Sequence, residues 1–462
     1  MRQDRYMKTI THLPFTRVLN RAAKLTLAMS LLAAGIAHAY DYGPAETYQW
    51  GPFTLNGFAK FEGVSTSNTC SSCQMYPTAA KDESWADTLV PGTHYGTAQQ
   101  ATFLVQPWLG AHFNLGKGFK LDGLYSQRWR NGNVDIPGFA YEENVALSHE
   151  DYGRLAVGAM TTRAWSLADY PYGTNLGQAY FWGASGAGYG LLLKQSARYT
   201  SRPFDVLEGD LVLESTYSAG ATGWRRNKPN LWEFYGQYHR GDLVIDGVIQ
   251  TTRNGTPSAW SHGPFTGLTP FPANDSVLSS SGQGVQILLA RYQLNAAVEL
   301  SGGVRHNHWS GANACIVVPA TSGQNNAQWN NMFNVDWNAD SITNSAGNSC
   351  KPAYAASSTD LMGGARSFRE RWEFYGSAAY LGKGSTNNPQ DRGQTNWALL
   401  STVGTRYNFN RYWQVYGYTG VISYGHLGLA PLAMPTNSAG SNVDSRVAKT
   451  GNFVGLGTVY AF

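Results

Sequence analysis

The stretch from Thr102 to Arg130 reads TFLVQPWLGAHFNL-GKG-FKLDGLYSQRWR, and it decides the fold that the sequence predicts. In its first half one set of alternate positions is apolar and the other is largely polar: Phe103, Val105, Leu109, Ala111 and Phe113 against Gln106, His112 and Asn114. A period of two residues indicates a β-strand with two unlike faces. The glycines around Lys117 mark a tight turn, and 119–130 returns with the same period. The stretch therefore predicts a β-hairpin.

The same period recurs along the chain. It gives sixteen predicted strands: 53–64, 102–115, 119–130, 140–149, 153–160, 191–202, 210–218, 231–240, 243–253, 284–294, 297–309, 359–368, 372–380, 396–409, 412–424 and 447–462. Short turns and long connections alternate strictly between these strands, and the strand at 359–368 is placed partly by that alternation. Such asymmetry is typical of bacterial outer-membrane barrels. We predict an all-β fold, a transmembrane antiparallel up-and-down β-barrel of about 16 strands.

Composition is compatible with this prediction. Only 14% of the residues are charged and 13% are aromatic, whereas average soluble domains carry about 25% charged residues. No stretch after residue 39 approaches the ~20 apolar residues that a helix needs to cross a bilayer. In a barrel, lipid contacts only every second side chain, so the strands show no long apolar run. A large secreted β protein is the alternative that composition leaves open.

The first 39 residues have the pattern of a secretory signal peptide, with scattered basic residues, the apolar run Leu25 to Ile36, and Ala37-His38-Ala39. We expect cleavage after Ala39 and a barrel formed by residues 40–462. The leader holds six basic residues and one acid, which leaves 28 of the 34 basic and 29 of the 30 acidic residues, a net charge of −1. Nothing in that balance favours nucleic-acid binding, which needs clustered positive charge.

Four cysteines follow the leader: Cys70, Cys73, Cys315 and Cys350. An even number in an exported chain favours disulfides, and four cysteines allow three connectivities. Pairing Cys70 with Cys73 and Cys315 with Cys350 is the simplest, because each pair lies within one long connection. A metal or redox site at Cys70 and Cys73 is the alternative, but a zinc site needs a second ligand pair. We expect two disulfides and no metal.

Charged residues on the polar faces of the strands are expected to point inward, because a charge facing lipid costs about 2–4 kcal/mol near the midplane. A barrel of this size encloses a water-filled lumen unless it is plugged. The predicted pore-lining residues are Lys60, Arg128, Arg130, Lys194, Arg198, Arg202, Arg406, Glu142 and Glu214. Of these, Arg128, Arg130, Lys194 and Arg198 flank the connection 161–190 and are placed to form a basic wall. In the competing arrangement Glu142, Glu214 and Glu233 reach the same place and cancel that wall.

The connection 161–190 reads TTRAWSLADYPYGTNLGQAYFWGASGAGYG. In position, length and Gly/Tyr content it resembles the inward-folded third loop of general Gram-negative porins. The segments YGRLAVG (152–158) and SARYTSRPF (196–204) also resemble the strands on either side of that loop, although the family usually has Arg or Lys where this chain has Ala159. The terminal strand ending in Phe462 resembles the C-terminal aromatic strand of outer-membrane barrels.

This resemblance implies a homotrimeric pore in the outer membrane of a Gram-negative cell. Its partners would be lipid, lipopolysaccharide and the small hydrophilic solutes and ions that diffuse through it, and it would need no cofactor. The constriction loop would include Arg163, Asp169, Tyr170 and Tyr172. The family's loop usually opposes several acids to a basic wall, whereas this stretch has only Asp169. With a basic wall we predict a mild anion preference that salt weakens, because fixed charge in a narrow passage concentrates counter-ions.

Two other functions stay open. The aromatic residues of 161–190 would suit a channel selective for sugars or aromatic solutes, unless they only pack the loop against the wall. A non-conducting barrel that acts as an adhesin or structural anchor would carry its binding surface on the connections 65–101 and 310–358. We do not expect an enzyme: no GxSxG, HExxH, phosphate-loop or dinucleotide motif stands in a suitable context, and His306 and His308 share a face without a supporting carboxylate.

Overall fold

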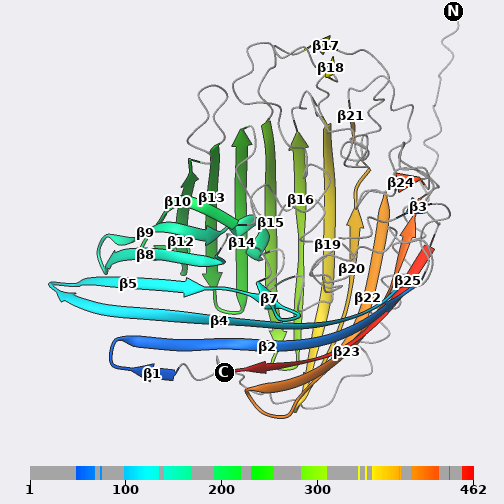
Figure 1. Cartoon of the computed structure of the whole chain (residues 1–462), viewed down its shortest axis with the longest axis horizontal. Helices are drawn as coiled ribbons and strands as arrows, with labels where there is room; N and C mark the ends of the chain where they lie inside the picture. Colours follow the sequence, from blue (N-terminus) through cyan, green and yellow to red (C-terminus); the bar gives the residue numbers. More distant parts are fainter. Residues whose placement is uncertain are drawn as a thin grey trace, which may run out of the picture.

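The computed structural model describes residues 48–67, 73–74, 98–134, 140–167, 172, 192–219, 230–253, 282–309, 342–343, 349–350, 356–383, 385–386, 397–425, 436–437 and 450–462. Sixteen of the described strands pair in one closed antiparallel barrel (Figure 1). They are β2 (Phe53–Thr66), β4 (Ala98–Gly116), β5 (Phe119–Ser126), β8 (Glu142–His149), β9 (Gly153–Thr161), β10 (Leu192–Thr200), β12 (Gly209–Ser218), β13 (Asn230–Arg240), β14 (Leu243–Arg253), β15 (Gly282–Asn295), β16 (Val298–Trp309), β19 (Ala356–Arg369), β20 (Trp372–Leu381), β22 (Ala398–Asn408), β23 (Trp413–Tyr424) and β25 (Thr450–Ala461). Among the described residues no helix is long and apolar enough to cross a bilayer.

All sixteen predicted strands are therefore confirmed, with ends that differ by at most four residues. A difference of four residues occurs at the start of β4 and at the end of the predicted strand 119–130, which breaks after Ser126. Its end becomes β6 (Trp129–Arg130), which pairs with β7 (Asn133–Val134) in a stretch that was predicted to be a loop. Asn131 and Gly132 both have positive φ, the backbone conformation of a two-residue hairpin turn.

Pairing of the first barrel strand with the last one closes the sheet. β2 pairs with β25 from Phe58 opposite Ala461 to Thr66 opposite Phe453. Two further hydrogen bonds extend this seam, from Gly57 N to Phe462 O (2.7 Å) and from Phe462 N to Gly57 O (2.9 Å). A closed sheet has no free edge, so the barrel strands satisfy one another's backbone groups without help from lipid.

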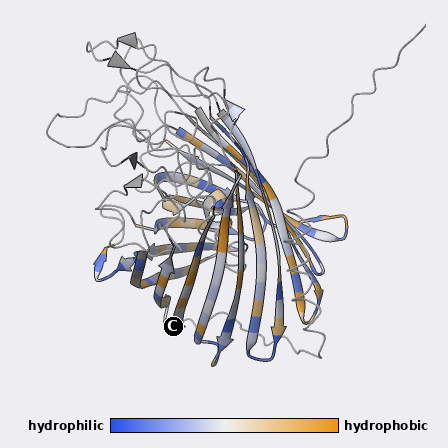
Figure 2. Ribbon diagram, turned by 90° about the vertical axis from the view of Figure 1, so that its right-hand side faces the viewer, coloured by the Kyte–Doolittle hydropathy of each residue, from blue (hydrophilic) through white to orange (hydrophobic). Residues whose placement is uncertain are grey.

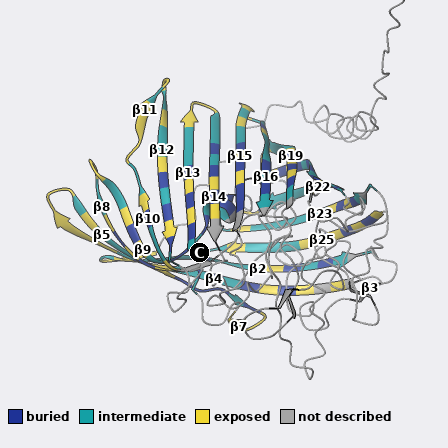
Figure 3. Ribbon diagram, turned by 90° about the horizontal axis from the view of Figure 1, so that it is seen from above, coloured by how far each residue is buried: buried dark blue, intermediate teal, exposed yellow. Residues whose placement is uncertain are grey.

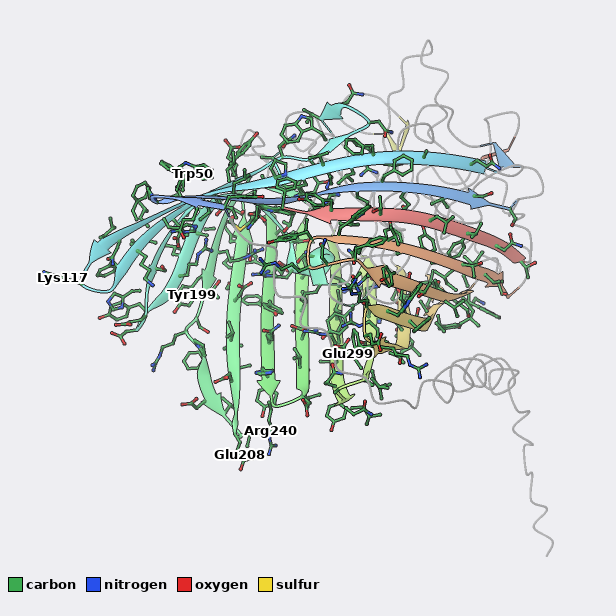
Figure 4. The ribbon with its side chains drawn as sticks, turned by 90° about the horizontal axis from the view of Figure 1, so that it is seen from below. Trp50, Lys117, Tyr199, Glu208, Arg240 and Glu299 are labelled. Atoms are coloured by element: carbon green, nitrogen blue, oxygen red, sulfur yellow. The ribbon has the colours of Figure 1, made fainter. Side chains whose placement is uncertain are left out.

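Short turns connect the strands at one end of the barrel. Lys117, Leu207, Glu208 and Gly241 have positive φ in these turns. Figure 4 shows Lys117, Glu208 and Arg240 at the tips of their hairpins. Glu208 and Arg240 form an exposed ion pair there. The strand ends that the long connections join lie at the opposite end, as the alternation of short and long connections predicts.

The two faces of the barrel wall differ in chemistry. On β13, Trp232 and Phe234 are 44% and 51% exposed on the outer face, while Glu233 and Tyr235 between and beside them are buried. The same alternation of exposed and buried residues recurs along many strands (Figure 3). Outward aromatic rings contact each other across strands, as Tyr217 and Trp232 do at 4.6 Å between ring centroids. The outer face is therefore largely apolar, as lipid requires.

The inner face is not polar throughout, which corrects the simple alternation. At the end with long connections, inward positions of several strands are apolar and fully buried, including Leu381, Leu400 and Ile422. These residues belong to one hydrophobic cluster with Ala164 and Tyr172 of the connection after β9. Figure 2 shows apolar and polar segments mixed along the strands. Apolar inward residues are favoured here because they are buried in one cluster with the side chains of Ala164 and Tyr172.

The cysteine predictions fall largely outside the described residues. Cys70 and Cys315 lie outside them, as does the predicted leader 1–39. Backbone pairing places Cys73 in β3 (Cys73–Gln74), opposite β24 (Thr436–Asn437). It places Cys350 in β18 (Ser349–Cys350), opposite β17 (Ile342–Thr343). The two disulfides stay a prediction.

A substitution at the seam tests how tightly the barrel closes. A Cβ added at Gly57 would lie 2.6 Å from Cζ of Phe462. We expect Gly57→Ala to lower the free energy of unfolding by about 1–3 kcal/mol, because overpacking displaces the terminal ring. Gly123→Ala is the control, since a Cβ there would only touch Ala111 at 3.8 Å. Urea unfolding in detergent measures both, and equal midpoints would contradict the proposed packing.

Candidate functional site

A short helix begins inside the barrel directly after β9. This helix, α2 (Arg163–Leu167), points its first backbone N–H groups at the wall. Arg163 N donates to Glu233 Oε1 (2.7 Å) and Ala164 N donates to Glu233 Oε2 (2.9 Å). The first N–H groups of a helix have no partner within it, and a carboxylate satisfies them well because they carry partial positive charge. Glu233 of β13 therefore fixes the start of α2 against the inner wall.

The side chain of Arg163 strengthens this attachment. Its Nε and Nη2 atoms donate to the two carboxylate oxygens of Glu214 on β12, at 2.5 Å and 2.8 Å. This bidentate geometry is the strongest arrangement for an arginine and a carboxylate. Burial of the Arg163 guanidinium lowers its pKa, but the hydrogen bond and charge of Glu214 outweigh that effect and raise the pKa. Arg163 therefore stays charged in this position.

Tyr172 makes a second attachment further along the same connection. Its hydroxyl donates to Asp246 Oδ2 on β14 at 2.5 Å. Tyr235 and Gln237 of β13 donate to the other oxygen of Asp246, each at 2.8 Å. Burial and the neighbouring Asp246 carboxylate raise the pKa of Tyr172 well above its ordinary value, so the phenol keeps the proton that it donates.

Two described parts of 161–190 thus contact the inner wall of β12 to β14. Of the predicted constriction residues, Arg163 and Tyr172 are among them, whereas Asp169 and Tyr170 lie outside the described residues. The inward fold of the whole connection stays a prediction. Sequence reasoning missed Glu233 and Asp246 as attachment points. Acids at inward positions of neighbouring strands were the available signal, but their partners depend on the register.

Arg198 does not stand alone on a basic wall. Its guanidinium lies 3.9 Å from Glu214 and 3.7 Å from Glu233. Its Nε also donates to Thr216 (2.8 Å), and its Nη2 donates to the carbonyl of Thr161 (2.7 Å). The sequence leaves open a basic wall or a wall whose charge is cancelled by acids. At Arg198 the second arrangement is present, because Glu214 and Glu233 offset its charge.

The other predicted pore-lining residues near Arg198 are Glu142, Arg202 and Lys194. Glu142 accepts a hydrogen bond from Asn144 (2.7 Å) on the inner face of β8. Arg202 is exposed beyond the end of β10, and the Lys194 side chain lies outside the described residues. A role in lining an open pore stays a prediction for all of them.

Among the residues that the structure describes, the partners of Arg128 are neutral. It lies in the break between β5 and β6, and its Nε donates to Gln106 Oε1 at 2.7 Å. Its guanidinium lies 4.2 Å from the ring centroid of the buried Tyr141. The amide of Gln106 is itself held by Ser126 at 3.0 Å. Among the described residues no carboxylate forms an ion pair with Arg128, so this amide and this ring position the guanidinium without offsetting its charge. Arg130, two residues further along the chain, is also buried.

A belt of alternating charges follows the inner wall from β16 to β22. Arg366 contacts Glu299 (2.8 Å) and Glu373 (3.3 Å), and Arg406 contacts the other oxygen of Glu373 at 3.0 Å. Glu299 lies directly opposite Arg366 in the register, as Glu373 does opposite Arg406. Arg366 and Glu373 each lie between two opposite charges, and Glu299 and Arg406 each contact one. These contacts lower the cost of holding the charges in a protein wall.

The predicted pore-lining Lys60 forms a further pair on β2, where its Nζ lies 3.1 Å from Glu62. Tyr416 of β23 also donates to Glu62, at 2.7 Å. His306 Nδ1 lies within hydrogen-bond distance of Thr359 Oγ1 (3.0 Å), and no carboxylate among the described residues pairs with it. No group of three or more potential metal ligands occurs among the described residues.

Comparison with known proteins identifies the fold. No protein-family model and no curated protein matches the chain. Among solved structures, an anion-selective porin from Comamonas acidovorans matches with a TM-score of 0.54 and 12% identity over 90% of this chain and 100% of that one. A mutant of OmpT, an outer membrane protein of Vibrio cholerae, that lacks loop L8 matches with a TM-score of 0.51 and 10% identity over 89% and 100%. The trimer form of OmpT matches with a TM-score of 0.50 and 12% identity over 89% and 99%. The chain has the fold of these outer-membrane barrels.

Removing the carboxylate that holds α2 tests the site directly. We expect Glu233→Ala to lower the free energy of unfolding by about 3–5 kcal/mol, because it leaves two helix N–H groups without their acceptor and removes one of the two carboxylates beside the buried Arg198. Urea unfolding of the reconstituted protein is the measurement.

Arg240→Ala is the matched control for Glu233→Ala. It breaks a pair whose side chains are 52% and 81% exposed, and exposed pairs contribute about 0–1 kcal/mol. If both variants lost the same stability, the role assigned to Glu233 would be wrong.

Proposed function

We propose that the chain forms an outer-membrane porin through which small hydrophilic solutes and ions diffuse passively. The observation that carries this proposal is the chemistry of the closed barrel. Its outer face suits lipid, while its inner face carries charged pairs from β2 round to β22. Buried ion pairs are costly in a dry core, and water inside the barrel would lower that cost. The shared fold with an anion-selective porin supports the same function.

We further propose a mild anion preference that rests on Arg128. The basic wall expected from the sequence included Arg198, but two carboxylates offset that charge. Arg128 contacts Gln106 and Tyr141, and no carboxylate among the described residues pairs with it. A fixed charge in a narrow passage with low-dielectric walls raises the local concentration of counter-ions. Arg128 is therefore the described residue best suited to favour anions.

The proposed location and assembly follow from the same features. Export through the leader 1–39 would deliver the chain to the outer membrane of a Gram-negative cell, where its apolar face contacts lipid and lipopolysaccharide. We propose a homotrimer, because closed symmetry around a three-fold axis would bury part of that face. The trimer form of OmpT supports this state. An oligomer band on unboiled gels that becomes a monomer on heating is expected, and a monomer under all native conditions would contradict it.

Reversal potentials in a salt gradient test the selectivity. The wild-type protein in planar bilayers should give steady single-channel currents with a mild anion preference. Arg128→Glu should shift the reversal potential toward cation preference, because it replaces a positive charge, which no described carboxylate pairs with, by a negative one. The shift should shrink at 1 M salt, where the Debye length is about 3 Å.

Arg240→Glu makes the same change of charge at a hairpin tip and should leave the reversal potential nearly unchanged. Cation preference in the wild type, or an unchanged potential in Arg128→Glu, would overturn the assignment to Arg128. Absence of any steady conductance would overturn the porin function and favour an adhesin or structural anchor.

A further inference from the structure

Four aromatic side chains lie flat against one part of the inner wall. They are Tyr375 on β20, Tyr416 and Tyr418 on β23, and Phe453 on β25. Each ring crosses a glycine of a neighbouring strand, and a Cβ added at that glycine would overlap the ring: Gly404 under Tyr375, Gly457 under Tyr416, Gly455 under Tyr418 and Gly420 under Phe453. The glycines therefore leave room for the rings to lie along the wall rather than project across the lumen.

Three of these rings form a row that follows the strand direction. Ring centroids of Tyr416 and Tyr418 are 6.2 Å apart with planes only 10° from parallel. Phe453 continues the row at 6.1 Å from Tyr418. Phe453 is buried, whereas Tyr416 and Tyr418 keep part of their surface accessible. We call Tyr416, Tyr418 and Phe453 the aromatic row.

Charged groups border the accessible end of the aromatic row. Glu62 accepts a hydrogen bond from the Tyr416 hydroxyl (2.7 Å), and Lys60 Nζ lies 6.0 Å from the centroid of the same ring. Arg406 lies directly opposite Tyr416 in the register. Acids and bases alternate here, with Lys60 paired to Glu62 and Arg406 to Glu373. The Lys60 and Arg406 side chains are partly exposed and offer hydrogen-bond donors, whereas the buried carboxylates of Glu62 and Glu373 balance their charge.

We propose that the aromatic row and its charged border form a binding site for neutral pyranose sugars inside the barrel. A pyranose has a flat C–H face that packs on an aromatic ring and a rim of hydroxyls that both donate and accept hydrogen bonds. An apolar platform with a few convergent polar groups is the usual composition of a small-molecule site. An organic anion fits less well, because the bordering cations are already paired with carboxylates.

This inference rests on the proposed porin function and deepens it, since a sugar reaches the row only through a water-filled lumen. It also moves the aromatic surface from the place that the sequence suggested. The aromatics of 161–190 were the candidates for a sugar path, whereas the row lies on β23 and β25. The pattern Tyr416-Gly417-Tyr418 facing Gly455-Leu456-Gly457 in the paired strand is its sequence signal.

Sugar block of the ion current tests the proposal with the full-length protein in planar bilayers. Maltose should reduce the single-channel current with saturation, whereas acyclic mannitol should reduce it only in proportion to the viscosity of the solution. Tyr418→Ala should raise the half-blocking concentration of maltose by at least about fivefold, the scale of losing one aromatic stacking surface. Tyr418→Phe should retain the block by maltose, because it keeps the ring face. Steady conductance of this variant also shows that a substitution at position 418 allows the barrel to fold.

Tyr292→Ala is the matched control, since Tyr292 is an exposed outward tyrosine of β15. Maltose should block the current through this variant as it does in the wild type. Steady conductance without a saturable effect of maltose would overturn the sugar site and leave the porin function intact. Equal block in wild type and Tyr418→Ala, or saturable block by benzoate but not by maltose, would also overturn it. Absence of steady conductance in the wild-type protein would instead refute the porin function on which the site rests.

Discussion

Closure of the sheet by β2 and β25 is the constraint on which the rest of the structure depends. A membrane-spanning sheet cannot leave a row of N–H and C=O groups facing hydrocarbon, and the seam that ends at Gly57 and Phe462 prevents this. Once the sheet is closed, every strand has an outer face for lipid and an inner face for whatever the barrel encloses. The alternation along β13, with Trp232 outside and Glu233 inside, follows from that geometry.

Charges on the inner face are mostly arranged so that each has an opposite neighbour. Arg366 lies between Glu299 and Glu373, and Arg198 lies between Glu214 and Glu233. Glu233 also receives the first N–H groups of α2, so one carboxylate serves both the wall and the helix inside it. In the proposed pore, selectivity would then come from the exceptions. Arg128, with an amide and a tyrosine ring as partners, is such an exception, and the aromatic row gives the wall a surface suited to uncharged solutes.

Strand positions were predictable because the alternation of apolar and polar residues and the residues of tight turns both depend on local backbone geometry. The hairpin after Arg130 was missed because its two-residue turn stands between very short strands. The buried inner residues Leu400 and Ile422 were missed because they stand beside the apolar Leu399 and Val421, where the period gives no contrast between the faces. Inward charges were predictable one at a time, but their partners were not. Whether Arg198 meets Glu233 depends on a cross-strand register and on where α2 begins, and neither is recorded in the local sequence.

Liposome swelling with uncharged solutes tests the central claim most directly, because it measures passive diffusion without relying on ion selectivity. Vesicles that contain the purified full-length protein are placed in isotonic solutions of polyols of increasing size. A water-filled barrel predicts rapid swelling with glycerol and a rate that falls steadily as the solute becomes larger. Swelling no faster than in protein-free vesicles for every solute would contradict the account and show that this barrel is not an open diffusion pore.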